Sequence, residues 1–184
     1  GICLGTVHDI TLDPIAQAQE AAATKTYQEV YPDAASFDEP QELADAVTAA
    51  ADSISEWGFG KVTINDAKEA LDASGNQIGY LITSTSAESY GGNVQIAVGI
   101  SNEGELTGIG FLSISDTPGL GMRAKEPDFK DQFIGKKAEN LEVTKTGASA
   151  DNQIEAISGA TITSKAVTNA TDAAIYFVAN CLAQ

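Results

Sequence analysis

The chain has 184 residues but only one histidine and two cysteines. His8 alone cannot build a histidine-rich metal site, and it argues against a His-based catalytic triad, because such sites need several groups in one constellation. We expect His8 to be solvated. Cys3 and Cys181 lie near the two ends of the chain without the spacing of metal ligands. The sequence leaves a disulfide between them open and favours two unpaired thiols.

Long apolar runs and basic residues are also scarce. The sequence has no stretch of about eighteen consecutive apolar residues, so we expect no segment of it to span a bilayer as a helix. The chain carries 26 acidic and 10 basic side chains, a formal net charge of −16 at pH 7. This charge repels nucleic acid and anionic membrane surfaces, which argues against nucleic acid as a partner.

The apolar pattern predicts an α+β fold, an antiparallel sheet packed by N- and C-terminal helices. Asp13 before Pro14 is a favourable helix start, and helical spacing follows as far as Tyr31. Between Val62 and Ile114 apolar residues alternate in segments separated by short turns, which indicates hairpins of an antiparallel sheet. Shorter elements are expected over 42–54 (helix), 126–133 (helix) and 140–146 (strand), and a final amphipathic helix from residue 162.

The length suits one well-filled domain. Within it we separate residues 1–60, an N-terminal helix followed by an acidic helical insertion, from residues 61–184. The second part contains the segments that carry the functional signal.

Two segments of small residues carry that signal. Residues 158–164 read Ser-Gly-Ala-Thr-Ile-Thr-Ser and precede the final helix, whose first N–H groups can bind an anion. Residues 116–121 read Asp-Thr-Pro-Gly-Leu-Gly, in which proline stiffens the chain and glycines let it turn and expose N–H groups. Taken alone, each fits an ordinary structure: a helix cap at Ser158 or Thr161, and a tight turn. Together they indicate one ligand site.

The pair of segments, about forty residues apart, resembles the covalent FMN-binding domain. That module occurs in the G subunit of Rnf electron-transport complexes and in the C subunit of sodium-pumping NADH:quinone reductases. The resemblance runs from about Ile78 to Val178, and the helix at 13–16 resembles the stretch after the membrane anchor of Rnf G subunits, which favours the G subunit. Three residues before Ser158, where the attachment signal usually has Asp, this chain has Glu155.

The resemblance implies that FMN is held by a phosphoester to Thr161. Small residues beside that threonine would leave room for the phosphate, and the hydroxyls of Ser158 and Thr163 would donate hydrogen bonds to it. The loop from Thr117 would contact the other end of the ligand, and Tyr90 would stack on the flavin ring. The expected cofactor-binding residues are therefore Thr161, Ser158, Gly159, Ala160, Thr163, Thr117, Pro118, Gly119, Leu120 and Tyr90.

The same resemblance implies an electron-transfer subunit whose soluble domain lies on the extracytoplasmic side of a membrane, behind an N-terminal anchor that this sequence lacks. Its partners would be the other membrane subunits of a complex that couples ferredoxin/NAD electron transfer to ion translocation, and a flavin transferase. The lack of a catalytic constellation agrees with a protein whose redox chemistry belongs to its cofactor. Three alternatives stay open: the flavin domain of an extracellular reductase, the C subunit of a sodium-pumping NADH:quinone reductase, and an acidic surface or solute-binding domain whose two motifs are only turns.

Overall fold

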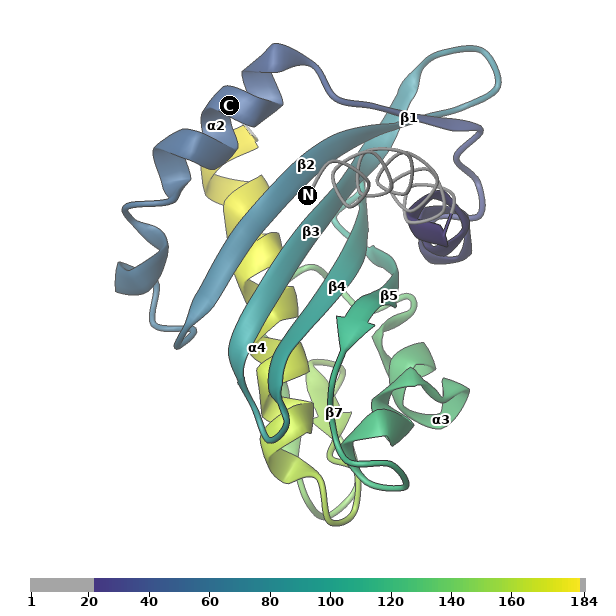
Figure 1. Ribbon diagram of the computed structural model, residues 1–184. Helices are drawn as coiled ribbons and strands as arrows, with labels where there is room; N and C mark the ends of the chain where they lie inside the picture. Colours follow the sequence, from purple (N-terminus) through teal and green to yellow (C-terminus); the bar gives the residue numbers. More distant parts are fainter. Residues whose placement is uncertain (1–21, 183–184) are drawn as a thin grey trace, which may run out of the picture.

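The computed structural model describes residues 22–182. Three predictions concern residues outside this range: the helix start at Asp13, the solvated His8, and Cys3 as a partner of Cys181. Within the range the fold is α+β, as predicted, with a twisted antiparallel sheet between two helical layers (Figure 1). No helix in the described range is long and apolar enough to cross a membrane.

The main sheet has five strands in the order in which they occur along the chain, each antiparallel to its neighbours. The registers include Ile82 opposite Val98 and Val98 opposite Ile109. This arrangement confirms the predicted hairpins, because strands joined by short turns can pair only in opposite directions. The strands are β1 (Ser36–Asp38), β2 (Val62–Leu71), β3 (Gln77–Ser89), β4 (Gly92–Ser101) and β5 (Leu106–Ile114).

Helices and short turns complete the described chain. Residues 22–30 form the first helical segment. The others are α2 (Gln41–Ala50), η1 (Ile54–Glu56), η2 (Gly121–Lys125), α3 (Pro127–Lys130), η3 (Asp131–Phe133), α4 (Thr161–Phe177) and the π-helical turn η4 (Val178–Leu182).

A second, small sheet differs from the prediction. Strands β6 (Glu142–Thr144) and β7 (Gln153–Glu155) pair in parallel. The strand predicted over 140–146 is thus shorter than expected, and its partner β7 is not among the predicted strands. Three-residue strands carry too little alternation for sequence patterns to identify.

The inner face of the main sheet packs against α4, which crosses β3 and β4 (Figure 1). Ile82, Ile96 and Val98 are fully buried there with Val167 and Phe177 of the helix. The helix can approach closely because much of its buried stripe is alanine, at positions 166, 170, 173 and 174. This packing fixes where the first turn of α4 lies.

The outer face of the sheet is covered in part by residues 22–30. Val30 from this helix is buried with Leu81 and Ala97. Gly99 and Gly110 lie beneath Val30, and a Cβ at Gly110 would overlap the Val30 side chain. Glycine at these strand positions therefore lets the first helix lie directly on the sheet.

Candidate functional site

The two predicted motifs meet at one pocket. The loop 116–121 follows the end of β5, and the segment 158–160 leads directly into Thr161, the first residue of α4. Between them lies a cavity of about 430 Å³, a volume within the range of small-molecule sites. Its lining residues are Tyr90, Asp116, Thr117, Leu120, Gly121, Gly159, Ala160, Thr161, Ile162 and Thr163.

Three of the ten predicted site residues lie outside this lining. Ser158 lines a neighbouring hollow together with Arg123 and Glu155. Pro118 and Gly119 are exposed at the tip of the loop and do not line the pocket. The structure brings the other seven together, and adds Asp116, Gly121 and Ile162, which are not among the ten predicted cofactor-binding residues.

The first turn of α4 has no side-chain cap. Ala160 occupies the cap position, with φ −133° and ψ 39°, and no side chain accepts a hydrogen bond from the helix start. Reading Ser158 or Thr161 as an ordinary helix cap is therefore wrong. The residues of this turn line the pocket, their N–H groups have no side-chain acceptor, and such a helix end favours an anion.

The hydroxyl of Thr161 has no hydrogen-bond partner among the described residues. Thr161 is half-buried and lines the pocket. Gly159, two residues earlier, has φ +79°, and a Cβ there would lie 3.1 Å from Cδ2 of Leu120. The chain thus turns at Gly159 in a conformation that glycine adopts without strain, close beneath the loop 116–121.

Asp116 links the two motifs. Its Oδ2 accepts hydrogen bonds from the hydroxyl of Ser89, at 2.6 Å, and from the hydroxyl of Thr163, at 2.5 Å. Its Oδ1 accepts the backbone N–H of Thr117, at 2.7 Å. The hydroxyl proton of Thr163 is therefore directed to Asp116, and Thr163 is fully buried.

Hydrogen bonding also controls the ionisation of Asp116. Partial burial acts to raise its pKa, but hydrogen bonds from Ser89, Thr163, Thr117 and the Gly91 N–H outweigh it and hold the pKa below the ordinary value. The group is thus a carboxylate at neutral pH, with donors converging on it from the end of β3, the loop and the helix.

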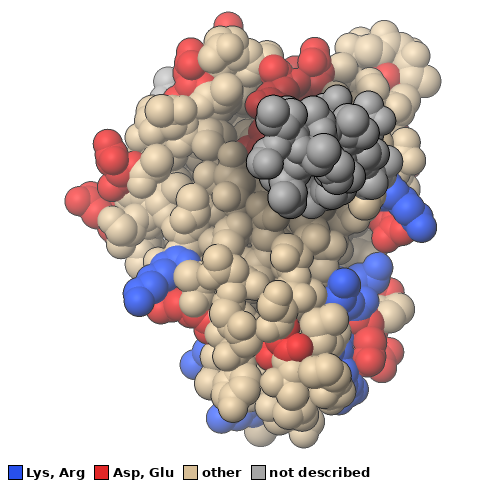
Figure 2. All heavy atoms as spheres, viewed as in Figure 1, with Lys and Arg blue, Asp and Glu red and all other residues tan. Residues whose placement is uncertain are grey.

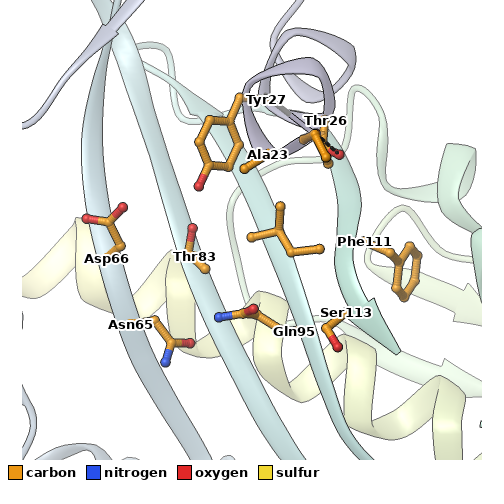
Figure 3. A pocket seen from close by; sticks show the side chains of 11 residues that line it. Ala23, Thr26, Tyr27, Asn65, Asp66, Thr83, Gln95, Phe111 and Ser113 are labelled. Atoms are coloured by element: carbon orange, nitrogen blue, oxygen red, sulfur yellow. Dashed lines mark hydrogen bonds between the residues drawn. The ribbon is translucent and has the colours of Figure 1, made fainter. Parts of the chain in front are cut away.

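A larger cavity of about 630 Å³ lies on the outer face of the sheet beside the first helix (Figure 3). Thr83, Gln95 and Ser113 from adjacent strands form its floor, and Tyr27 and Phe111 stand at its sides. The hydroxyl of Thr83 is buried there without a partner among the described residues. Neither predicted motif reaches this cavity, so the pocket at the start of α4 is the candidate site.

The described residues contain no candidate metal site. Between residues 22 and 182 no three His, Cys, Asp or Glu side chains gather so as to hold a metal ion. On the face seen in Figure 2 the acidic side chains are dispersed rather than collected in one patch. The excess of carboxylates is therefore read as a solvated surface.

Comparison with known proteins agrees with this pocket. A family described as "FMN-binding domain" matches residues 89–176, which include both motifs. The chain is 35% identical to the G subunit of the Na(+)-translocating ferredoxin:NAD(+) oxidoreductase complex of Acetobacterium woodii, over 96% of this chain and 84% of that protein. It is 34% identical to the G subunit of the proton-translocating ferredoxin:NAD(+) oxidoreductase complex of Clostridium ljungdahlii, over 62% of this chain and 67% of that protein.

A solved structure shares the fold. The crystal structure of Shewanella oneidensis NqrC matches with a TM-score of 0.53 at 18% sequence identity, covering 64% of this chain and 61% of that one. At this identity the likeness concerns the fold alone.

Proposed function

Because this chain belongs to the family of G subunits of ion-translocating oxidoreductase complexes, we propose that it is an electron-transfer subunit carrying FMN through a phosphoester to Thr161. Its domain lies on the extracytoplasmic side of a membrane, among the other subunits of a complex that couples electron transfer between ferredoxin and NAD to ion translocation. The relatives named above move Na⁺ in one case and protons in the other, so the coupled ion is left open.

The observation that carries the proposal is the free hydroxyl of Thr161 at an uncapped helix start. A phosphodiester at this hydroxyl would keep one negative charge beside the N–H groups of the first turn. Such a charge is stabilised there by about 0.3–1 kcal/mol, and by more where the site is partly buried. The helix end thus supplies the electrostatic partner that a phosphate needs.

The residues around Thr161 fit the rest of an FMN molecule. Gly159 leaves the approach to the helix start open, because any side chain there would meet Leu120. Leu120 and Ile162 offer apolar surface at the pocket, since the two residues are 43% and 54% exposed, and Tyr90 is 72% exposed. These three can cover a planar ring system, and Thr117 adds a hydroxyl beside them.

The attachment step follows from the chemistry of the threonine. With FAD as the donor and a flavin transferase as the catalyst, the Thr161 oxygen would attack the phosphorus of the FMN half. A new Oγ1–P bond would form and the P–O bond of the pyrophosphate would break, so that AMP would leave and the hydroxyl proton would pass to the medium. No oxidation or reduction takes place in this step.

Bound FMN would supply the redox chemistry. The polypeptide would tether it, shield part of it between the loop 116–121 and α4, and leave the rest exposed toward a neighbouring subunit. No proton transfer by a side chain is required for this role, which agrees with a pocket lined mainly by small, hydroxyl and apolar side chains.

The decisive experiment is expression with a flavin transferase and FAD, followed by denaturation. We expect flavin fluorescence to move with the wild-type polypeptide on a denaturing gel, and the intact mass to rise by one FMN less one water. Thr161→Ala should abolish both signals, and Thr161→Ser, which restores a hydroxyl, should recover them. Fluorescence that persists in Thr161→Ala would refute attachment at this residue, and colour lost on denaturation would refute the covalent link.

Sidedness needs a separate test in cells. Protease added outside intact spheroplasts should digest this domain in the assembled, membrane-bound complex, with a cytoplasmic protein as the protected control. Digestion only after the membrane is opened would place the domain on the cytoplasmic side and contradict the proposal.

A further inference from the structure

The donors around Asp116 come from three segments that are distant in sequence. Ser89 lies at the end of β3, 27 residues before Asp116, and Thr163 lies 47 residues after it in α4. Thr117 belongs to the loop itself. One carboxylate therefore joins the strand end, the loop and the helix start that together enclose the pocket.

Neighbouring glycines leave room for this arrangement. A Cβ at Gly121 would overlap the carboxylate of Asp116, and a Cβ at Gly91 would overlap the backbone at Ser115 and Asp116. Gly121 is buried although it lies in a loop of otherwise accessible residues. Gly91 and Gly121 thus leave the space that the Asp116 carboxylate and its backbone occupy.

We propose that Asp116 is the positioning residue of the flavin site: by accepting the Thr163 hydroxyl it fastens the loop 116–121 to the first turn of α4 and sets the pocket for attachment at Thr161. This inference rests on the proposed function and deepens it. Asp116 does not carry out the attachment chemistry. It acts through Thr163, which lies two residues along the helix from the modified hydroxyl.

The other contact between the loop 116–121 and the start of α4 is too weak to fix their spacing without the Asp116–Thr163 hydrogen bond. The loop approaches the segment before α4 through Leu120 near Gly159, and it reaches the helix itself through the hydrogen bond from Thr163 to Asp116. Leu120 is 43% exposed, so its contact is a weak restraint. A hydrogen bond to a charged group is shorter and stronger than one between neutral groups. Asp116–Thr163 is therefore the contact that fixes the spacing of the two motifs.

Thr163→Val tests the hydrogen bond from Thr163 to Asp116 without removing the carboxylate, since valine keeps the shape of threonine and lacks the donor. We expect FMN attachment by the transferase to slow by roughly ten- to a hundredfold, the range in which small misplacements of reacting groups act. Amide hydrogen exchange in the unmodified chain should accelerate in both 117–121 and 161–164. Thr163→Ser, which restores the hydroxyl, should recover both measurements.

Asp116→Ala should reproduce both effects, and the double variant Asp116→Ala/Thr163→Val should be no slower than the slower single variant, because the two residues act through one bond. Ser84→Ala is the matched control. Its buried hydroxyl bonds the Ala170 carbonyl at 2.9 Å, far along α4, so it removes a comparable hydrogen bond without touching the pocket. Its attachment rate should equal that of the wild type.

The possible results separate two failures. Wild-type attachment rates in Thr163→Val and Asp116→Ala would overturn the positioning role. Slower attachment with unchanged exchange in the two segments, or equal slowing in Ser84→Ala, would also overturn it. If the wild type itself takes up no FMN, the proposed function fails, and the exchange measurements still decide whether Asp116 ties the loop to the helix.

Discussion

Asp172 is an acidic side chain in the middle of α4 that is only 4% exposed. Its Oδ1 accepts the backbone N–H of Leu141 at 2.9 Å, which holds the segment before β6 against the helix. Burial raises the pKa of Asp172 to about 7, and the hydrogen bond from Leu141 opposes this rise only in part. The folded protein therefore holds a proton that the unfolded chain releases.

The direction of the pH dependence follows from this difference. In the unfolded chain Asp172 ionises near pH 4, whereas in the folded chain it ionises near pH 7. Its contribution to stability is complete below pH 4 and is lost as the pH rises toward 7, because the folded state binds more protons in that window. Above about pH 7 the folded protein carries a buried, ionised carboxylate.

Asp172→Asn should remove the free-energy cost of burying an ionised carboxylate while keeping an oxygen that can accept the Leu141 N–H. Each unit of pKa is worth about 1.4 kcal/mol, so the full difference is on the order of 4 kcal/mol at pH 8. The new amide N–H must be desolvated, which costs about 1–3 kcal/mol if it finds no partner. Because this second cost is the same at every pH, we expect the variant to be about 1–3 kcal/mol less stable than the wild type at pH 4 and roughly 1–3 kcal/mol more stable at pH 8, a change on the order of 4 kcal/mol.

Urea denaturation of the two proteins at pH 4, 5, 6, 7 and 8 measures this change. Asp52→Asn, at an exposed position, controls for the loss of one negative charge from a chain of net charge −16. After this correction the stability of the variant relative to the wild type should rise between pH 4 and pH 7 and then level off. A difference that is constant over the whole range would refute the raised pKa and the reasoning built on it.

Three further outcomes are expected. Gly159→Val should lower the free energy of unfolding, measured in urea, by about 1–3 kcal/mol, because φ +79° strains a β-branched residue. The variant should also fail to take up FMN, as shown by the absence of flavin fluorescence on a denaturing gel. Normal FMN uptake would contradict the packing argument at Leu120. Ser84→Ala should cost about 1 kcal/mol in the same assay, since it leaves the Ala170 carbonyl without its 2.9 Å donor; no loss would show that water replaces the hydroxyl. Burial acts to raise the pKa of Asp116, but hydrogen bonds outweigh it and lower the pKa. The carboxylate therefore stabilises the fold above about pH 4, and this stabilisation disappears as the pH falls through the lowered pKa. In an acid titration followed by circular dichroism, Asp116→Asn should lose less stability between pH 5 and 2 than the wild type; equal losses would mean that the hydrogen bonds do not stabilise the ionised carboxylate.

The sheet and the last helix could be predicted because their signals are local. Val94, Ile96, Val98 and Ile100 alternate within one strand, and all four are buried on the face that packs against α4. The short turn after them forces antiparallel pairing. The apolar stripe of the final helix is equally visible in the sequence, and α4 begins one residue before the predicted start.

The finer geometry of the site depends on contacts that a sequence pattern does not contain. Ser158 resembles a ligand residue by its position in the motif, but the turn at Gly159 places it in a neighbouring hollow. Asp116 belongs to one of the two motifs, yet its role depends on Ser89 and Thr163, 27 and 47 residues away. Composition, periodicity and spacing cannot show which of two hydroxyls in one helical turn points to a carboxylate.

The missing cap on α4 has a consequence for how this protein is completed. The longest helix of the described fold begins after a residue, Ala160, that has nothing to offer its N–H groups. If FMN is attached to Thr161 as proposed, its phosphate would lie beside these N–H groups. A flavin transferase would then supply, after translation, the acceptor that the side chains at the start of this helix do not provide.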